Sequence, residues 1–253
     1  MHSTAVRAFA DNYVWLVRRG PGDPLIIVDP GQAEPVLDAL RADETPSAIL
    51  LTHHHADHIG GVADLRERFP GIRVIGPTDS RVPADERVQP GDRIDVAGIE
   101  FEILDLSAHT IGHIGFMAEG HLFCGDALFS LGCGRLFEGT ADDLTRVMDL
   151  MRSLAPSTQI YCAHEYTQAN ARFALAVDPH NAELRSYASQ INELRSRDEI
   201  TLPTTIAKEL QCNPFLRSED AAVAASIDAH FGSMSANRVE RLMRLRQWKD
   251  NYA

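Results

Sequence analysis

The chain has 253 residues, of which 44% are hydrophobic and 24% are charged, so it can form one large globular domain or two unequal ones. Its formal net charge of −12 repels a phosphate backbone, which argues against nucleic acid or an anionic membrane surface as the main partner. An anionic small-molecule substrate would therefore need a local basic pocket in this acidic protein.

The sequence shows no membrane or secretion signal. No apolar run approaches the roughly 20 residues that cross a bilayer, and the first residues lack the basic start and continuous apolar core of a secretory signal. The four cysteines form no CxxC pair and are too sparse for a disulfide framework in a chain of this size. We therefore expect a cytoplasmic protein with reduced cysteines and no membrane partner.

Short apolar runs alternate with amphipathic stretches over the first two thirds of the chain, which is typical of strands layered against helices. The predicted strands are residues 13–17, 25–28, 48–51, 73–75, 101–104, 114–117, 121–124 and 159–162. A helix is predicted after Thr140, because Asp142 and Asp143 supply an acidic first turn and an apolar stripe follows at helical spacing. The stripe consists of Leu144, Val147, Met148 and Met151.

The character of the sequence changes after about Ala163, where helical periodicity replaces the strand signal. One helical face collects Leu184, Tyr187, Ala188, Ile191 and Leu194, and another collects Val239, Leu242 and Met243. We therefore expect the rest of the chain to be helical.

A histidine-rich segment, Thr-His-His-His-Ala-Asp-His-Ile-Gly-Gly at residues 52–61, directly follows the predicted strand at 48–51. Residues two apart in an extended segment point the same way, so His53 and His55 can reach one ion from one side. Asp57 and His58 lie where the chain bends toward a helix and can face a second ion. His54 points to the opposite side of the segment, and we do not count it as a ligand.

Further candidate ligands follow predicted strands later in the chain. They are His109 in His-Thr-Ile-Gly-His, Asp126 in Phe-Cys-Gly-Asp and His164 in Tyr-Cys-Ala-His. Sites on layered α/β scaffolds are commonly built at such strand ends. Imidazole and carboxylate suit zinc, iron or manganese. A single histidine would more simply be a solvated loop residue, but the pattern H-x-H-x-D-H favours a metal site.

These motifs resemble those of the metallo-β-lactamase superfamily, namely T-H-x-H-x-D-H, a histidine in H-T-x-G-H, a bridging aspartate and a final histidine. The resemblance implies an α/β fold, an αββα sandwich with a C-terminal helical domain. It divides the chain into a catalytic domain at residues 1–165 and an α-helical substrate-binding domain at residues 166–253. It also implies two divalent metal ions per chain, with zinc as the first choice and iron or manganese as alternatives.

Carried over position by position, the superfamily's ligands fall on seven residues. His53, His55 and His109 would hold one ion, Asp57, His58 and His164 the other, and Asp126 would bridge both. Two such ions about 3.5 to 4 Å apart lower the pKa of a shared water to about 7, which makes a bridging hydroxide available for hydrolysis. Asp57 and Asp126 are the expected catalytic residues, whereas His113 is expected to support the fold.

Other segments resemble the glyoxalase II family in particular. They are Asp-Asn-Tyr at 11–13, Gly-Cys-Gly-Arg-Leu-Phe-Glu-Gly-Thr at 132–140 and Ala-His-Glu-Tyr-Thr at 163–167, with Asn-Pro-Phe-Leu-Arg at 213–217 and Arg-Gln-Trp-Lys-Asp at 246–250 in the helical part. The resemblance spans essentially the whole chain. It implies a hydroxyacylglutathione hydrolase of methylglyoxal detoxification, which converts the thioester S-D-lactoylglutathione to D-lactate and glutathione. A monomer acting on this small-molecule partner is expected.

The glutathione-binding residues implied by this family are Arg135, Tyr166, Arg246 and Lys249. Glutathione carries two carboxylates, so cations are the appropriate partners. Phe137 departs from the tyrosine that the family often has, and Ala108 from a common glycine or cysteine. Asp29 either hydrogen-bonds a ligand histidine or serves only as a turn residue in Asp-Pro-Gly.

Two other functions stay open from the sequence. A mono-iron persulfide dioxygenase acting on glutathione derivatives shares the H-x-H-x-D-H segment, but it is not expected to carry the C-terminal helices with Arg246 and Lys249. A non-catalytic metal-binding protein that kept the fold is the second alternative, although all seven predicted ligands are present. Counting metal ions per chain and assaying thioester turnover would separate the three functions.

Overall fold

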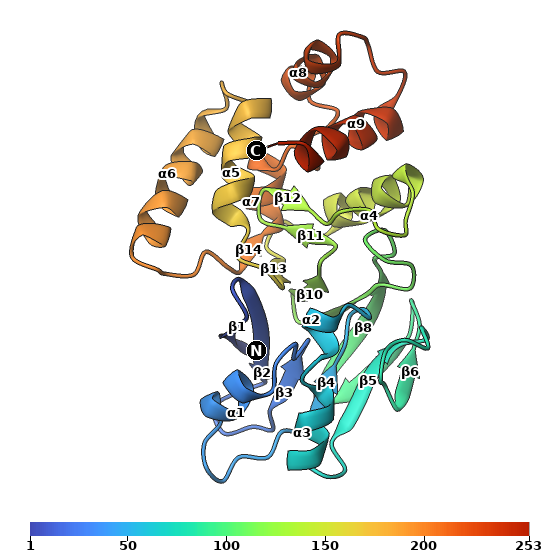
Figure 1. Cartoon of the computed structure of the whole chain (residues 1–253), viewed down its shortest axis with the longest axis vertical. Helices are drawn as coiled ribbons and strands as arrows, with labels where there is room; N and C mark the ends of the chain where they lie inside the picture. Colours follow the sequence, from blue (N-terminus) through green and yellow to red (C-terminus); the bar gives the residue numbers. More distant parts are fainter. Residues whose placement is uncertain (253) are drawn as a thin grey trace. The chain divides into compact units, whose positions relative to one another are not determined.

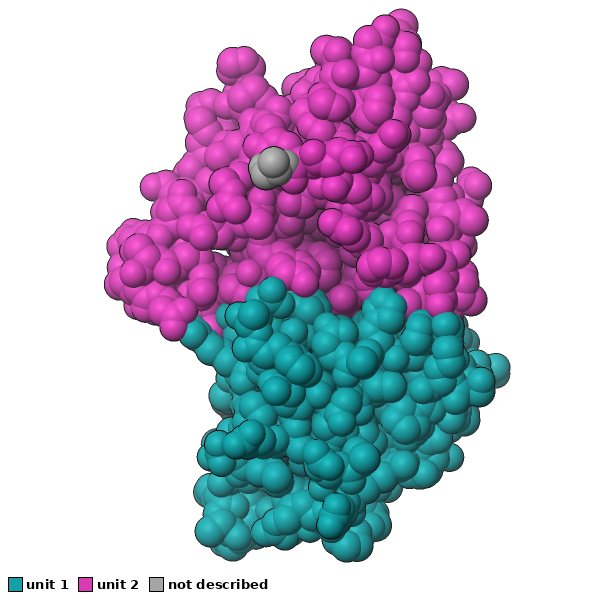
Figure 2. Space-filling view, in the orientation of Figure 1, with its two compact units in different colours: residues 1–106, 112–125, 161–164 teal, residues 107–111, 126–160, 165–253 magenta. Residues whose placement is uncertain are grey.

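The computed structural model describes residues 1–252. The chain divides into two compact units, which Figure 2 colours separately. Unit 1 consists of residues 1–106, 112–125 and 161–164, and unit 2 consists of residues 107–111, 126–160 and the described residues from 165 onward. Each unit is therefore assembled from several stretches of sequence.

The first sheet lies in unit 1 and contains six strands in chain order (Figure 1). The first three pair antiparallel, and the third to the sixth pair parallel. The strands are β1 (His2–Ala8), β2 (Asn12–Arg18), β3 (Ile26–Val28), β4 (Ala48–Leu50), β5 (Arg73–Pro77) and β6 (Glu86–Val88).

Strand β2 is buried on both faces. Its side chains point alternately to the two faces, and each face packs against a different layer. Val14 and Leu16 join an apolar cluster that also contains residues of α1 (Glu34–Ala39) and α3 (Val62–Arg68). Trp15 points the other way, and its ring lies 4.9 Å from that of Tyr161, edge to face. Within unit 1, helices thus cover one face of the first sheet, and Tyr161 of the second sheet packs on the other face.

The second sheet has the order β14-β13-β10-β9-β8-β7. Its members β7 to β10 form an antiparallel meander. The strands are β7 (Arg93–Val96), β8 (Ile99–Asp105), β9 (Ile114–Ala118), β10 (His121–Gly125), β13 (Gln159–Cys162) and β14 (Thr204–Thr205). A short helix, α2 (Ala56–Ile59), lies between β4 and α3.

Unit 2 is mainly helical and includes a short hairpin, β11 (Leu128–Phe129) and β12 (Gly132–Cys133). Leu131 at the hairpin turn packs with apolar residues of α5, α6 and α7. The helices are α4 (Ala141–Ser153), α5 (Thr167–Val177), α6 (Ala182–Ser196), α7 (Ile206–Cys212), α8 (Ala221–Phe231) and α9 (Arg238–Asp250).

The mixed sheets and the C-terminal helices confirm the predicted α/β class, and every predicted strand is present. The helix predicted after Thr140 is also confirmed, with its whole apolar stripe buried. One predicted face is wrong in part: Leu242 is buried, but Met243 is 45% exposed. The buried face of α9 instead contains Leu242, Leu245 and Arg246, which have the spacing i, i+3, i+4. None of the helices in residues 1–252 is long and apolar enough to span a bilayer.

Candidate metal centre and substrate-binding residues

Three predicted ligands lie together in unit 1: Asp57 and His58 of α2, and His164 just after β13. Their ligand atoms lie within 4.8 Å of one another. Asp57 Oδ2 is 3.6 Å from His58 Nε2 and 3.3 Å from His164 Nε2. Two imidazoles and one carboxylate at this spacing form a set that could hold a divalent metal ion.

Hydrogen bonds fix which ring nitrogen of these histidines faces Asp57. His58 Nδ1 lies 3.0 Å from Asp29 Oδ2, and His164 Nδ1 lies 2.9 Å from Asp11 Oδ1. Carboxylates accept, so each Nδ1–H donates and the lone pair of each ring lies on Nε2. Metal-binding histidines have this arrangement, with the distal N–H held by a carboxylate or carbonyl.

The pair His53 and His55 precedes α2, with ring centroids 4.7 Å apart. His53 Nδ1 lies 3.1 Å from Thr52 Oγ1, and the Thr52 hydroxyl donates to Asp29 Oδ2 at 2.7 Å. Because that hydroxyl proton is used, Thr52 Oγ1 accepts from His53 Nδ1–H, and the lone pair of His53 also lies on Nε2. Asp29 therefore positions His58 directly and His53 through Thr52, which decides the question that its turn context left open.

Sequence reasoning assigned no role to Asp11 or Asn12 individually. Asn12 Nδ2 donates to Asp57 Oδ2 at 3.0 Å, while Asp11 accepts from His164. The backbone fixes this arrangement, since the Tyr13 amide donates to the Ala163 carbonyl at 2.7 Å. The Asp-Asn-Tyr segment thus positions two predicted ligands.

In unit 2, His109 and Asp126 form a second pair of predicted ligands. His109 Nε2 lies 3.4 Å from Asp126 Oδ2, and both side chains are buried. His109 Nδ1 donates to the Arg135 carbonyl at 2.8 Å, so its lone pair also lies on Nε2. His109 thus has the same tautomer as His53, His58 and His164.

The histidines that were not counted as ligands have other contacts. His113 Nε2 lies 3.1 Å from the Cys124 carbonyl, and its ring stacks on His53 with centroids 4.5 Å apart. His54 Nδ1 lies 3.4 Å from Asp79. His113 supports the fold, as expected, and His54 is directed toward a different carboxylate from its neighbours.

The four predicted glutathione-binding residues all lie in unit 2. Burial, followed by the charges of Arg246, Arg172 and Arg135, lowers the pKa of Lys249 to about 8. Asp250 lies 3.0 Å from Arg246 and 3.5 Å from Arg135. The sequence suggested no role for Arg172 or Asp250. A local cluster of positive charge therefore exists in this acidic protein, with one carboxylate inside it.

Tyr166 and Arg246 are held by the β11–β12 hairpin. The Tyr166 ring lies 5.1 Å from that of Phe129, and Arg246 donates to the Cys133 carbonyl at 2.8 Å. Arg246 is only 5% exposed, whereas the side chain of Arg135 is 62% exposed. Arg135 is therefore the more accessible of the two predicted arginines.

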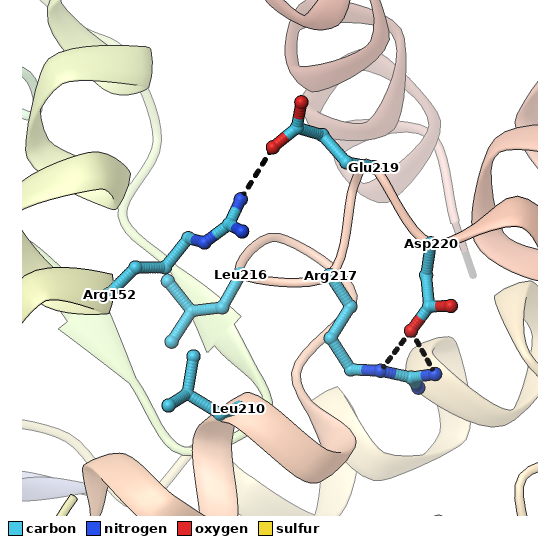
Figure 3. A pocket seen from close by; sticks show the side chains of 6 residues that line it. All are labelled: Arg152, Leu210, Leu216, Arg217, Glu219 and Asp220. Atoms are coloured by element: carbon cyan, nitrogen blue, oxygen red, sulfur yellow. Dashed lines mark hydrogen bonds and ion pairs between the residues drawn. The ribbon is translucent and has the colours of Figure 1, made fainter.

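A separate pocket of about 320 Å³ lies in unit 2 (Figure 3). Its charged side chains pair with one another, Arg152 with Glu219 at 2.8 Å and Arg217 with Asp220 at 2.6 Å. The pocket is lined by Arg152, Leu210, Leu216, Arg217, Glu219 and Asp220. None of these is a predicted site residue, so we do not place the site there.

Comparison with known proteins links both parts of the chain to one family. Residues 9–164 match the family model described as the metallo-beta-lactamase superfamily, and residues 165–252 match the model of the hydroxyacylglutathione hydrolase C-terminus. The hydroxyacylglutathione hydrolase of Idiomarina loihiensis is 45% identical over 253 residues, covering 99% of this chain and 100% of that protein. The one from Stenotrophomonas maltophilia is 47% identical, covering 100% and 99%. The chain belongs to the hydroxyacylglutathione hydrolase family.

Solved structures agree with the metallo-β-lactamase fold of this hydroxyacylglutathione hydrolase family member. ETHE1 from Myxococcus xanthus aligns with a TM-score of 0.68 at 22% identity, covering 99% of this chain and 91% of that chain. The BLEG-1 B3 metallo-beta-lactamase aligns at 0.63 and 23% identity, covering 85% and 99%. TTHA1623, described in a di-iron-bound form, aligns at 0.59 and 26% identity, covering 85% and 100%. The first two likenesses show the fold alone.

Proposed function

We propose that this family member is a metal-dependent thioester hydrolase that converts S-D-lactoylglutathione to D-lactate and glutathione. Its full-length relatives are named for hydroxyacylglutathione hydrolysis, which supports this reaction. The observation that carries the proposal is that Nδ1 of His53, His58, His109 and His164 in each case lies within 3.1 Å of an oxygen atom of the protein, which assigns the N–H to Nδ1. The lone pair of each ring is then on Nε2, where it can bind a metal ion.

Two divalent ions fit these residues as the superfamily resemblance divides them. His53, His55 and His109 would hold one ion, Asp57, His58 and His164 the other, and Asp126 both. When bound, such ions lower the pKa of a shared water and polarise the carbonyl of the substrate. Imidazole and carboxylate accept zinc, iron and manganese, and we propose zinc as the first choice. The di-iron-bound form of the relative TTHA1623 supports a two-metal centre in this fold.

The residues of the chain prepare this centre. Asn12 orients Asp57, whose side chain is 39% exposed, while His58 beside it is fully buried. The Asp57 carboxylate is thus the part of its cluster that solvent reaches most easily. Because a thiolate leaves readily, the reaction needs no strong protein acid for the leaving group.

The basic cluster around Lys249 would bind the carboxylates of glutathione. Arg135 supplies an exposed guanidinium, Lys249 a point charge, and Arg246 a buried charge between the hairpin and Asp250. Local positive charge of this kind is what an anionic substrate needs in a protein with a net charge of −12.

A thiol-release assay on S-D-lactoylglutathione and on an acyl thioester without glutathione tests this function, with metal analysis of the same sample. We expect turnover of the first substrate only. In Asp126→Ala we expect kcat to fall by roughly 100-fold or more, because residues that only support metal ligands already account for about 10- to 100-fold. Asp142→Ala on the surface of α4 is the matched control. Absence of thiol release, or one iron with oxygen uptake on glutathione persulfide, would overturn the proposal.

A further inference from the structure

Three polar side chains bind the backbone of the β11–β12 hairpin. Asn170 Nδ2 donates to the Ser130 carbonyl at 3.0 Å, and Glu209 Oε2 accepts from the Leu131 amide at 2.8 Å. Asn213 Nδ2 donates to the Gly132 carbonyl at 3.0 Å and to the Phe129 carbonyl at 3.3 Å. We call Asn170, Glu209 and Asn213 the anchor residues. Four consecutive hairpin residues, 129–132, are thus held from outside the hairpin.

The anchor residues are buried, and two of them, Glu209 and Asn213, also bind each other. Glu209 and Asn213 are 0% exposed and Asn170 is 4% exposed. Glu209 Oε2 also accepts from Asn213 Nδ2 at 2.9 Å, and Glu209 Oε1 accepts from the Thr204 hydroxyl at 2.7 Å. Burial raises the pKa of Glu209, while the hydrogen bonds of Thr204, Leu131 and Asn213 act in the opposite direction. A buried carboxyl is unfavourable unless it is hydrogen-bonded, and Glu209 accepts from the Leu131 amide, from Asn213 and from Thr204.

The ends of the hairpin carry residues of the proposed site. Asp126 lies two residues before β11, and Arg135 lies two residues after β12. The carbonyl of Arg135 accepts the Nδ1–H of His109, and the carbonyl of Cys133 accepts from Arg246. A shift of the hairpin would therefore move Asp126, Arg135 and the partner that orients His109 together.

Close packing leaves the hairpin little freedom to move. A Cβ on Gly132 would lie 2.6 Å from Asn170 Nδ2. A Cβ on Gly134 would lie 2.1 Å from the Asp126 carbonyl oxygen and 3.0 Å from His109 Nδ1. The Gly-Cys-Gly sequence thus lets the backbone lie directly against an anchor residue at one glycine and against two predicted metal ligands at the other.

We propose that Asn170, Glu209 and Asn213 are positioning residues, which hold the β11–β12 hairpin so that His109 and Asp126 bind metal and Arg135 binds substrate. This inference rests on the proposed function. It assigns a functional reason to the Asn-Pro-Phe segment at 213–215 and to a buried glutamate that no step of hydrolysis uses.

Two near-isosteric variants of the full chain separate this role from general stability. Asn213→Asp removes the donor to Phe129 and Gly132 and places a second carboxyl beside Glu209. Glu209→Gln keeps one oxygen for Leu131 and Asn213, and its new NH₂ can donate to Thr204, whose hydroxyl also accepts. We expect Asn213→Asp to lower kcat at least tenfold, as losses around metal ligands do, and to raise KM. The kcat of Glu209→Gln should stay within about threefold of the wild-type value, because its hydrogen bonds are kept.

Ile227→Ala, in the buried face of α8, is the control for destabilisation alone. Zinc bound per folded chain and hydrogen exchange at the Leu131 amide are read beside the kinetics. We expect Asn213→Asp to bind less zinc and to exchange Leu131 faster, and Ile227→Ala to change neither. If Asn213→Asp folds too poorly to assay, Asn170→Ser decides by the same readouts.

The inference fails if Asn213→Asp, or Asn170→Ser in its place, behaves like Ile227→Ala. In that case KM and the zinc bound per folded chain would be unchanged, and kcat would fall only in proportion to the folded fraction. It also fails if Glu209→Gln is as damaging as Asn213→Asp, since charge rather than hydrogen bonding would then matter. A wild-type protein without turnover or zinc would instead overturn the proposed function, and the Leu131 exchange rates would still show whether the anchor residues hold the hairpin.

Discussion

The orientation of the histidine rings is set by the oxygen atoms that accept hydrogen bonds from them. Asp29 is the strongest example, because its two oxygens accept from the Thr52 amide, the Thr52 hydroxyl and His58. It has a positive φ of 51°, a conformation that asparagine also tolerates. The residue is therefore placed for its hydrogen bonds at some conformational cost.

Asp29→Asn tests this role of the carboxylate. The backbone should be retained, but neutralising the acceptor weakens its hold on His58 and on Thr52. We expect zinc affinity to fall roughly 10- to 100-fold, measured by competition with a chelating dye. Asp198→Asn, at a similar φ of 56°, is the matched control. Equal zinc affinity in the two variants would contradict the role.

Lys249 gives a second prediction at this scale, concerning pH. Its pKa of about 8 lies below the ordinary value of 10.5, so the ammonium is charged below pH 8 and loses its charge as the pH rises above it. The pH dependence of kcat/KM reports the titrating groups of the free enzyme. We expect kcat/KM to fall about tenfold between pH 7 and 9.5, because the substrate then loses one charge-assisted hydrogen bond from Lys249. Lys249→Arg stays charged, so its profile should be flatter. Identical profiles would exclude Lys249 as the titrating group.

The ligand pattern at 53–58 could be predicted because its members are close in sequence. The contacts that orient the ligands could not, because they join distant residues: Asn12 and Asp57 are 45 positions apart, and Asp11 and His164 are 153 apart. The first contact joins β2 to α2, and the second forms where the start of β2 meets the chain after β13. The roles of the seven ligands and four glutathione-binding residues stay predictions.

At the scale of elements, the strands with continuous apolar runs were predictable because burial on both faces demands them. Strand β1 was not, since its residues are mostly exposed or half-buried up to Ala5. The two-residue strands β11, β12 and β14 are too short for any periodicity, and they form through tertiary contacts. The helix periodicity in α9 was misjudged because a buried arginine, Arg246, takes an apolar position.

Helix α4 shows local sequence and structure in agreement. Thr140 Oγ1 accepts from the Asp143 amide at 3.2 Å, and Asp143 Oδ2 accepts from the Thr140 amide at 2.9 Å, which is a capping box. We expect Thr140→Ala to lower the free energy of unfolding by about 1 kcal/mol in urea and to leave kcat unchanged. Thr145→Ala, inside the same helix, should have a smaller effect. An equal effect of both substitutions would show that the cap contributes nothing specific.

At the scale of the whole molecule, the proposed domain boundary at residue 165 stays a prediction. The two family models meet there, at residues 9–164 and 165–252, whereas the compact units interleave along the chain. His109 and Asp126 belong to unit 2 although both precede residue 165. Monomeric state likewise stays a prediction.

The two-metal centre is the central claim, because hydrolysis, the role of Asp29 and the anchor residues all depend on it. Its most direct test is a count of tightly bound divalent metal per chain after reconstitution with zinc and removal of loose ions. We predict two ions per chain for wild type and about one for His164→Ala, which lacks a ligand of only one proposed ion. One ion or none in the wild-type protein would contradict the account.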